Sequence, residues 1–288
     1  MGVDIQGKGR AMGFWRGLGI FALLLLAVAI AVLRGLDAWR TKPVIAELHL
    51  PPAFMVARDF DFGRYRLSWR GSGFGVYAQK RPEKTLWAAE GGFLAAGVGR
   101  KAPSLLQQEL LCRDQSLESV ERLGGRLLLK GHLRCADGSL SGYTLSLEDD
   151  GERGLLLKVT LGEPKLNRLY LSWRRDLGER VYGFGELSGA YDMSGRRLVV
   201  LLSGDSDVGE GGRSIIATQA FYLTSGLRAF HSQSVAYQVF DLRDPQRIGL
   251  EVHEGQLSAR IYKGESPQEL RAHQASVVGV MSTPAPSK

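Results

Sequence analysis

The sequence predicts an all-β protein: an antiparallel β-sandwich preceded by a single N-terminal transmembrane helix and followed by one short C-terminal helix. Three observations support this fold class. Apolar and polar residues alternate along many short segments, a pattern typical of strands with one buried face. The 288 residues include 37 glycines but only 10 prolines, which favours many tight turns. Turn signals recur about every 8–12 residues, as in sandwiches.

The N-terminal helix is expected over about residues 14–36. Residues 18–33 carry no charge and lie between Arg16 and Arg34. A membrane span needs about 20 residues, and flanking arginines can reach the interface. A cleaved signal peptide is the alternative, although Arg34 falls where a cleavage region should be small and neutral. We therefore expect a single-pass membrane protein, held in the lipid bilayer, with its globular domain on the periplasmic or extracellular side.

The rest of the chain is expected to be one sandwich with short flanking segments. The clearest hairpin pairs residues 140–148 with 155–161, and residues 126–133 would pair with 140–148 across the turn CADGS. The expected parts are a tail and anchor over 1–42, a linker over 43–52, the sandwich over 53–278, and a C-terminal linker or truncated end over 279–288.

The C-terminal helix has recognisable boundaries. Ser266 is a suitable N-cap, Pro267 suits the first helical position and Glu269 the third, and Gly279 would end the helix.

The two cysteines, Cys112 and Cys135, are either a disulfide or two buried thiols. A hairpin turning near Gly124 would bring them opposite each other, which favours the disulfide.

Several kinds of chemistry are excluded. The net charge is +7, but more than half of that excess lies in residues 1–42, and no basic stripe with aromatic residues suggests nucleic acid. The five histidines are scattered, so neither a metal site nor a cofactor is expected.

Asp205, Asp207 and Glu210 lie together in a glycine-rich loop. Such a loop is either simply solvated or contacts a ligand.

The most unusual stretch is GERVYGFGELSGAYDMSGRRL, residues 178–198. Its glycines do not have the spacing of a dinucleotide-binding loop, and no lysine completes a phosphate loop. The simplest interpretation is a turn between two strands, with glycine where the backbone needs a positive φ. The residues singled out here are Tyr182, Gly183, Phe184, Gly185, Glu186, Arg196 and Arg197.

The order of these motifs resembles a known family. ERVYGFGE, then DMSGRR, an acidic glycine-rich loop and AFYLTS are similar to the N-terminal, galactose-mutarotase-like β-sandwich of glycoside hydrolase family 31. The resemblance covers roughly residues 50–280. Within the family, the SGRR turn and the glycine-rich loop are more similar to the sulfoquinovosidase-like branch.

This resemblance implies a carbohydrate partner, an α-glycoside. Residues 182–186, with Arg196 and Arg197, would form a pocket wall or face the family's catalytic barrel. Asp205 would contact the sugar, with Asp207 as the alternative. The family's (β/α)₈ barrel and both of its catalytic aspartates are absent from this chain, so no catalytic residue is assigned and enzymatic activity is left open.

Two classes of function follow. In the first, the chain is the noncatalytic, sugar-pocket-forming part of a membrane-anchored family 31 α-glycosidase, whose barrel lies in cis or comes from a split gene. In the second, it is a non-enzymatic membrane-anchored sandwich that binds glycan or lipid, or serves as an envelope scaffold. A barrel-coding reading frame immediately downstream would favour the first.

Overall fold

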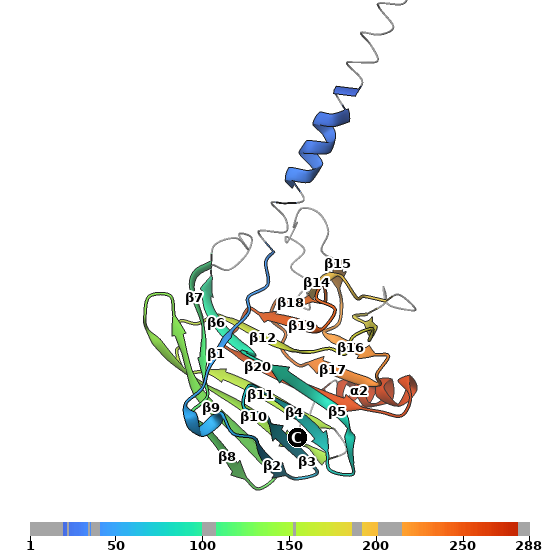
Figure 1. Cartoon of the computed structure of the whole chain (residues 1–288). Helices are drawn as coiled ribbons and strands as arrows, with labels where there is room; N and C mark the ends of the chain where they lie inside the picture. The colour runs from blue at the N-terminus through green and yellow to red at the C-terminus, as the bar shows by residue number, and fades with distance from the viewer. Residues whose placement is uncertain are drawn as a thin grey trace, which may run out of the picture. The chain divides into compact units, whose positions relative to one another are not determined.

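The computed structural model describes residues 20–21, 23–33, 35, 41–99, 108–151, 154–185, 192–200 and 215–281 (Figure 1). Two units are distinguished, Met1–Pro43 and Val44–Lys288. The second unit contains the strands, which confirms the all-β sandwich.

The elements of this unit follow one another along the chain. The first part contains β1 (Glu47–His49), a 3₁₀ turn (Pro52–Phe54), β2 (Arg58–Phe62), β3 (Tyr65–Trp69), β4 (Gly73–Ala78), β5 (Arg81–Glu90), β6 (Leu94–Gly99), β7 (Gln108–Ser116), β8 (Ser119–Leu123), β9 (Arg126–Cys135) and β10 (Leu140–Asp149). The second part contains β11 (Leu155–Leu161), β12 (Arg168–Arg174), β13 (Val181–Gly183), β14 (Arg197–Val200), β15 (Ile215–Ala217), β16 (Phe221–Thr224), β17 (Arg228–Ser232), β18 (Gln238–Asp241), β19 (Arg247–Val252), β20 (Gln256–Lys263) and α2 (Pro267–Met281).

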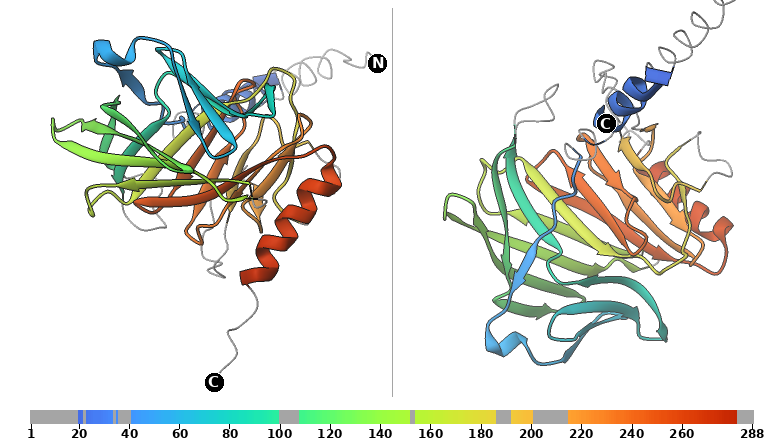
Figure 2. Two further views of the ribbon diagram at one scale, coloured as in Figure 1. Left: turned by 90° about the horizontal axis from the view of Figure 1, so that it is seen from below. Right: turned by 45° about the horizontal axis from the view of Figure 1, so that its top comes forward.

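The described strands form one large and one small sheet. The large sheet follows the order β13-β16-β17-β20-β11-β10-β9-β7-β6-β12-β19-β18-β14-β15, with β1 beside β7 and β8 beside β9. The small sheet is the antiparallel meander β2-β3-β4-β5. It lies against β9, β12 and β20 of the large sheet (Figures 1 and 2).

Two halves of the large sheet face each other across an aromatic core. Strands β16 and β17 belong to one half, and β12 and β18 belong to the other. Trp173 of β12 stacks on Phe230 of β17, with ring centroids 4.9 Å apart, although these strands are far apart in the sheet order. The indole Nε1 of Trp173 also donates a hydrogen bond to the hydroxyl of Tyr222 on β16, at 3.0 Å. Burial of such rings is the main source of sandwich stability, so this contact joins the halves.

The hairpins expected from the alternating pattern are confirmed. Strand β10 pairs with β9 on one side and with β11 on the other, and Leu147 is opposite Leu127 and Leu157. All three leucines are fully buried. The structure also joins Cys112 of β7 to Cys135 of β9 by a disulfide, and the two residues are opposite each other in the strand register.

The C-terminal helix begins as expected. The hydroxyl of Ser266 accepts a hydrogen bond from the amide of Glu269, and the Glu269 carboxylate accepts one from the amide of Glu265. Helix α2 continues to Met281, beyond the stop expected at Gly279. A glycine inside a helix costs only about 1 kcal/mol, so glycine alone does not end one.

The expected transmembrane helix is wrong. Within the described part of the chain, no helix has both the length and the apolar character that crossing a bilayer requires. The expectation of a single-pass membrane location, which depended on this helix, is corrected with it.

The segment expected to be a linker contains a strand. Residues Glu47–His49 form β1, which pairs in parallel with residues Asp114–Ser116 of β7. Leu48 and Leu50 alternate with Glu47 and His49, as in a strand, but the prolines at 43, 51 and 52 indicated a linker instead. Both leucines are partly buried against the main core.

Candidate functional site

The Tyr-Gly-Phe-Gly segment is a sharp turn that follows an edge strand. Strand β13 pairs only with β16 among the described strands, and Gly183 is opposite Tyr222. Gly183, Phe184 and Gly185 then have φ values of 124°, 73° and 103°. Three successive positive φ values turn the chain abruptly, and glycine supplies two of them without steric cost. A side chain at Gly183 would place its Cβ 2.7 Å from the carbonyl oxygen of Phe221.

Phe184 is the residue that this turn inserts into the sandwich. Its side chain is 2% exposed, and its ring lies 5.7 Å from that of Tyr222 and 5.0 Å from that of Phe240. A positive φ is unfavourable for a phenylalanine. Burial of the ring between two strands of opposite halves offsets this cost. Tyr182, in contrast, is half-buried against a second, smaller apolar cluster that includes Phe221 and Leu270.

The structure brings the end of the Tyr-Gly-Phe-Gly turn close to the end of β14, the strand that precedes the acidic loop in sequence. Gly185 lies beside Thr218, whose amide donates to the carbonyl of Phe184 at 3.3 Å. Val200, the last described residue of β14, is opposite Ala217 of β15. The chain therefore leaves Gly185 and Val200 next to the adjacent residues Ala217 and Thr218. These four residues define what we call the loop base.

A carboxylate fixes the turn that precedes β14. Asp192 accepts hydrogen bonds from the amides of Ser194 at 2.9 Å and Val181 at 3.3 Å. Burial raises the pKa of Asp192, but hydrogen bonds from Ser194 and Val181 lower it overall. Because an ionised carboxylate accepts these bonds best, Asp192 links the Ser-Gly-Arg-Arg turn to β13.

Of the arginine pair, Arg196 is exposed at the turn and Arg197 begins β14, opposite Asp241. Met193 packs in the main core just before them. The two arginines thus lie at the opposite end of β14 from the loop base.

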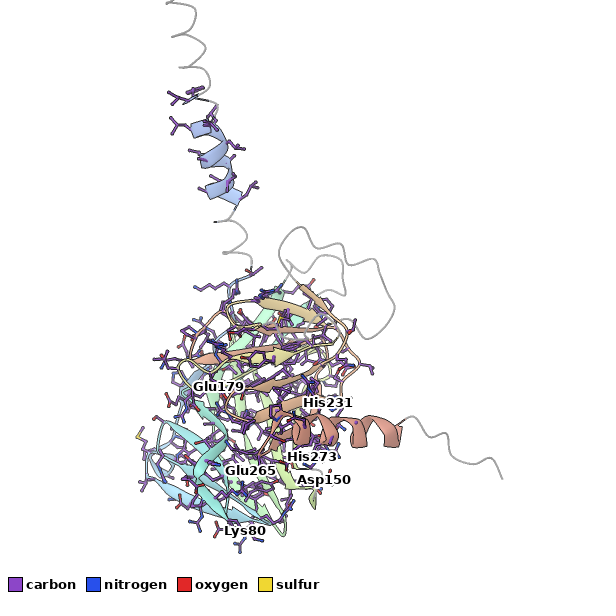
Figure 3. The ribbon with its side chains drawn as sticks, turned by 90° about the vertical axis from the view of Figure 1, so that its right-hand side faces the viewer. Lys80, Asp150, Glu179, His231, Glu265 and His273 are labelled. Carbon is purple, nitrogen blue, oxygen red and sulfur yellow. A yellow bond between two sulfur atoms is a disulfide. The ribbon has the colours of Figure 1, made fainter. Side chains whose placement is uncertain are left out.

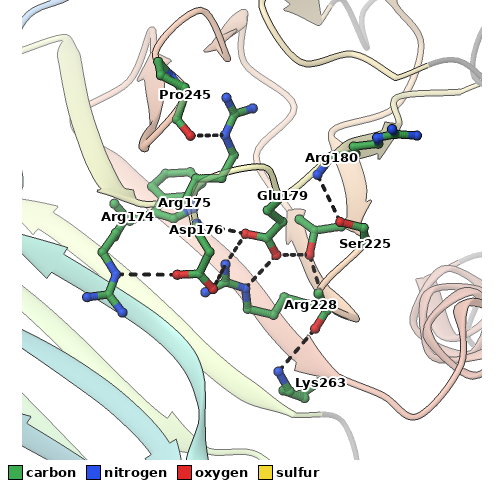
Figure 4. A network of polar contacts seen from close by, with 12 residues as sticks. Arg174, Arg175, Asp176, Glu179, Arg180, Ser225, Arg228, Pro245 and Lys263 are labelled. Atoms are coloured by element: carbon green, nitrogen blue, oxygen red, sulfur yellow. Dashed lines mark hydrogen bonds and ion pairs between the residues drawn. The ribbon is translucent and has the colours of Figure 1, made fainter.

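A buried ion pair supports the start of β13 (Figure 4). The guanidinium of Arg228 donates from Nε to Oε1 of Glu179 at 3.0 Å, and its second nitrogen contacts Oε2 of the same carboxylate. Thr224 donates its hydroxyl to Glu179, and Asp176 accepts from Arg228 at 3.1 Å. The side chains of Arg228 and Glu179 are only 9% and 4% exposed.

The two charges stabilise each other against desolvation. Burial alone raises the pKa of Glu179, but the hydrogen bond and charge of Arg228 lower it below its usual value. Burial lowers the pKa of Arg228, whereas the hydrogen bond and charge of Glu179 raise it overall. Both groups therefore stay ionised. Glu179 holds its proton too weakly to act as an acid near neutral pH, which assigns the pair a positioning role rather than a reactive one.

Several residues singled out from the sequence lie outside the described residues, namely Glu186, Asp205, Asp207 and Glu210. Their contacts to a ligand stay predictions. Among the residues that the structure describes, no group of three or more His, Cys, Asp or Glu side chains is placed to hold a metal ion.

Sequence reasoning missed the role of Glu179 and Arg228. A signal was present: Arg228, Phe230 and Ser232 occupy alternate positions of β17, so an arginine falls on the same face as a core phenylalanine. An arginine on a buried face requires a carboxylate partner. The partner itself, 49 residues away, had no local signature.

Comparisons with known proteins found likenesses of structure. No family model and no curated protein matches the sequence. A GH31 family sulfoquinovosidase from E. rectale, solved with an aza-sugar inhibitor, is similar over 72% of this chain, with 16% identity and a TM-score of 0.49. A GH31 dextranase from Flavobacterium johnsoniae matches over 77% of this chain, with 10% identity and a TM-score of 0.34. A cycloalternan-degrading enzyme from Trueperella pyogenes matches over 75%, with 17% identity and a TM-score of 0.33.

This chain corresponds to only part of each of those proteins. The matched region is 33% of the sulfoquinovosidase, 27% of the dextranase and 33% of the cycloalternan-degrading enzyme. The solved structures that resemble this chain thus include enzymes of glycoside hydrolase family 31, and the chain spans about a third or less of their length.

Proposed function

We propose that this chain is a noncatalytic accessory sandwich that supplies sugar-contacting loops to a family 31 α-glycosidase. The observation that carries the proposal is the loop base. The YGFG turn, whose motif resembles that family, ends at Gly185, and β14, which precedes the glycine-rich acidic motif, ends at Val200; these two residues lie beside Thr218 and Ala217. Two segments that start side by side can contribute to one ligand surface.

The acidic loop has the chemistry for binding hydroxyl groups. A carboxylate accepts hydrogen bonds from two sugar hydroxyls, and bonds to a charged acceptor are roughly twice as strong as neutral ones. Asp205 follows β14 by five positions, with Asp207 next, and the glycines at 204, 209, 211 and 212 would permit close approach of the backbone. We assign Asp205 the main contact and Asp207 a lesser one.

The chain is proposed to need a catalytic partner domain. Retaining hydrolysis requires two carboxyl groups about 5–5.5 Å apart across the glycosidic bond. The buried carboxylate described here, Glu179, is neutralised by Arg228. A (β/α)₈ barrel, joined in cis or supplied by a separate chain, would provide the two catalytic carboxylates.

Reconstitution tests this proposal. The full chain, a family 31 barrel lacking its own sandwich, and a fusion of the two are each assayed on p-nitrophenyl α-glycosides, with folding checked by circular dichroism. We expect the chain alone to be inactive and the fusion to exceed the barrel alone in kcat/KM. Equal activity of the folded barrel and folded fusion would contradict an accessory role. Sugar binding without any gain in activity would support a glycan-binding module instead.

A further inference from the structure

A cavity away from the loop base has five lysine and arginine side chains in its lining. It has a volume of about 280 Å³ and lies between the small sheet, β20 and the first turns of α2. This is close to the lower end of the ~300–1,000 Å³ typical of small-molecule sites. Its lysine and arginine side chains come from Arg64, Lys80, Arg81, Lys84 and Lys263, and two carboxylates, Glu265 and Glu269, also line it. Figure 3 labels three residues that line it, Lys80, Glu265 and His273. We refer to this site as the basic cavity.

Only part of this positive charge is neutralised. Arg64 pairs with Asp149, and Arg81 pairs with Glu265. Among the described residues, no carboxylate lies within ion-pair distance of Lys80 or Lys84. Uncompensated cations that line one concave surface concentrate a positive potential there, and such a potential attracts anions.

The pKa of Lys263 is affected by these positive charges. Its ammonium group donates to the carbonyl of Gly226 at 3.2 Å. Burial lowers the pKa of Lys263, and the charges of Arg228 and Lys84 lower it further. An anion in the basic cavity would offset the charge of Lys84, which lines it. The geometry and the charge distribution therefore favour the same occupant.

Tyr262, a neutral residue, also lines the cavity. The side chain of Tyr262 is 2% exposed, and its hydroxyl oxygen is buried with no hydrogen-bond partner among the described residues. Its ring stacks on His273, with centroids 5.6 Å apart. Burial raises the pKa of Tyr262 to about 12, so the hydroxyl keeps its proton. A buried hydroxyl without a partner costs about 1–3 kcal/mol, which a ligand acceptor would recover.

We propose that the basic cavity binds a small phosphate-type anion, held by the ammonium groups of Lys80 and Lys84 and by the hydroxyl of Tyr262. Lysine is a common phosphate ligand because its compact charge has three rotatable donors. A volume of about 280 Å³ fits either free phosphate or a small phosphate ester. This proposal does not depend on sugar binding at the loop base.

Calorimetric titration of the full-length chain tests the proposal. Inorganic phosphate and glucose 6-phosphate are titrated at fixed ionic strength, with glucose as the neutral comparison. We expect saturable binding of at least one phosphate compound and none of glucose. The stronger of the two phosphate compounds identifies the source of the anion. Absence of saturable binding by both would overturn the proposal.

Variants locate the binding. The double substitution Lys80→Gln/Lys84→Gln should weaken phosphate affinity at least tenfold and leave the unfolding temperature of the anion-free protein unchanged, because both side chains are exposed. Tyr262→Phe, which keeps the ring and removes the hydroxyl, should weaken it about threefold or more. Lys158→Gln/Lys165→Gln, at two exposed sites outside the cavity, is the charge-matched control. Equal affinity in the double variant and the control would overturn the proposal, even if Tyr262→Phe failed to fold.

Discussion

Arg228 and Glu179 form a two-point ion pair between β17 and the segment that leads into β13, with both side chains nearly excluded from solvent. The pair fixes the position of a short edge strand that has one partner among the described strands. Gly226 packs directly against it, since a Cβ there would lie 2.4 Å from Oε1 of Glu179. The carboxylate therefore holds the strand from which the Tyr-Gly-Phe-Gly turn begins.

Removal of one member of this pair should be strongly destabilising. Glu179→Gln leaves the Arg228 charge buried and only partly paired, and we expect unfolding free energy to fall by about 3–5 kcal/mol in urea titrations. Glu148→Gln, which removes an exposed partner of Arg126, is the matched control. An exposed pair contributes about 0–1 kcal/mol. Similar losses in both variants would contradict the assigned role.

Acid should weaken this pair in a defined direction. The pKa of Glu179 is lower in the folded chain than its ordinary value of 4.5. Its contribution to stability is therefore fully present above about pH 4.5 and lost as pH falls through the lower folded value. Glu179→Gln should flatten the stability curve below pH 4.5. Burial also lowers the pKa of His231 from its ordinary value of 6.5. Protonation of His231 therefore begins to reduce stability as the pH falls below about 6.5. A His231→Gln variant separates this contribution from that of Glu179. An unchanged acid slope in Glu179→Gln would contradict this prediction.

Gly185 should not tolerate a side chain. Its φ is 103°, and an added Cβ would lie 2.1 Å from the hydroxyl oxygen of Thr218. Gly185→Ala should lower the unfolding free energy by about 1–3 kcal/mol or more, through backbone strain and the clash. Gly124 also has a positive φ, 60°, but nothing lies within 4 Å of the added Cβ. Gly124→Ala therefore measures strain without a clash, and an equal loss in both variants would show that contact with Thr218 is unimportant.

The disulfide is expected in the purified protein. Cys112 and Cys135 are 23 residues apart in sequence. In the chain-entropy model, a crosslink of this size contributes about 3 kcal/mol. Non-reduced peptide mapping by mass spectrometry should find the linked pair, and the double substitution to alanine should lower the unfolding temperature. Two thiols that alkylate in the unfolded, non-reduced protein would contradict the pairing.

In the barrel fusion, Asp205→Ala should lower kcat/KM by about 10–100-fold, equivalent to ~1.5–3 kcal/mol for a charged hydrogen bond. Asp207→Ala should have a smaller effect. Asp59→Ala, on β2 of the small sheet, is the control for loss of a carboxylate. Equal, negligible effects of Asp205→Ala and Asp207→Ala would show that this loop does not touch the sugar.

Local patterns predicted the hairpins and the start of α2 because their determinants are close in sequence. Leucines alternate along residues 140–161, and Ser266, Pro267 and Glu269 form a capping signal within four positions. The same reasoning failed at the N-terminus. There, an uncharged run was equated with a membrane span, but no helix within the described residues has the length and apolar character that crossing a bilayer requires.

Long-range features could not be predicted in this way. The sequence indicated that glycines 183 and 185 require positive φ, but not that Phe184 between them is buried against Phe240. Nor could spacing show that Gly185 and Val200 meet at Ala217 and Thr218. Such contacts depend on which strands become neighbours, and the strand order is set by packing of the whole sandwich.

The position of β20 between β11 and β17 has a consequence for biosynthesis. Leu157 pairs with Ala259, about a hundred residues later in the chain. At roughly 5–20 residues per second, a ribosome needs about 5–20 s to make that interval. During this time the β11 edge, with its buried leucines, has no partner on that side and can pair with another chain. We therefore expect the growing polypeptide to depend on chaperones until β20 has emerged.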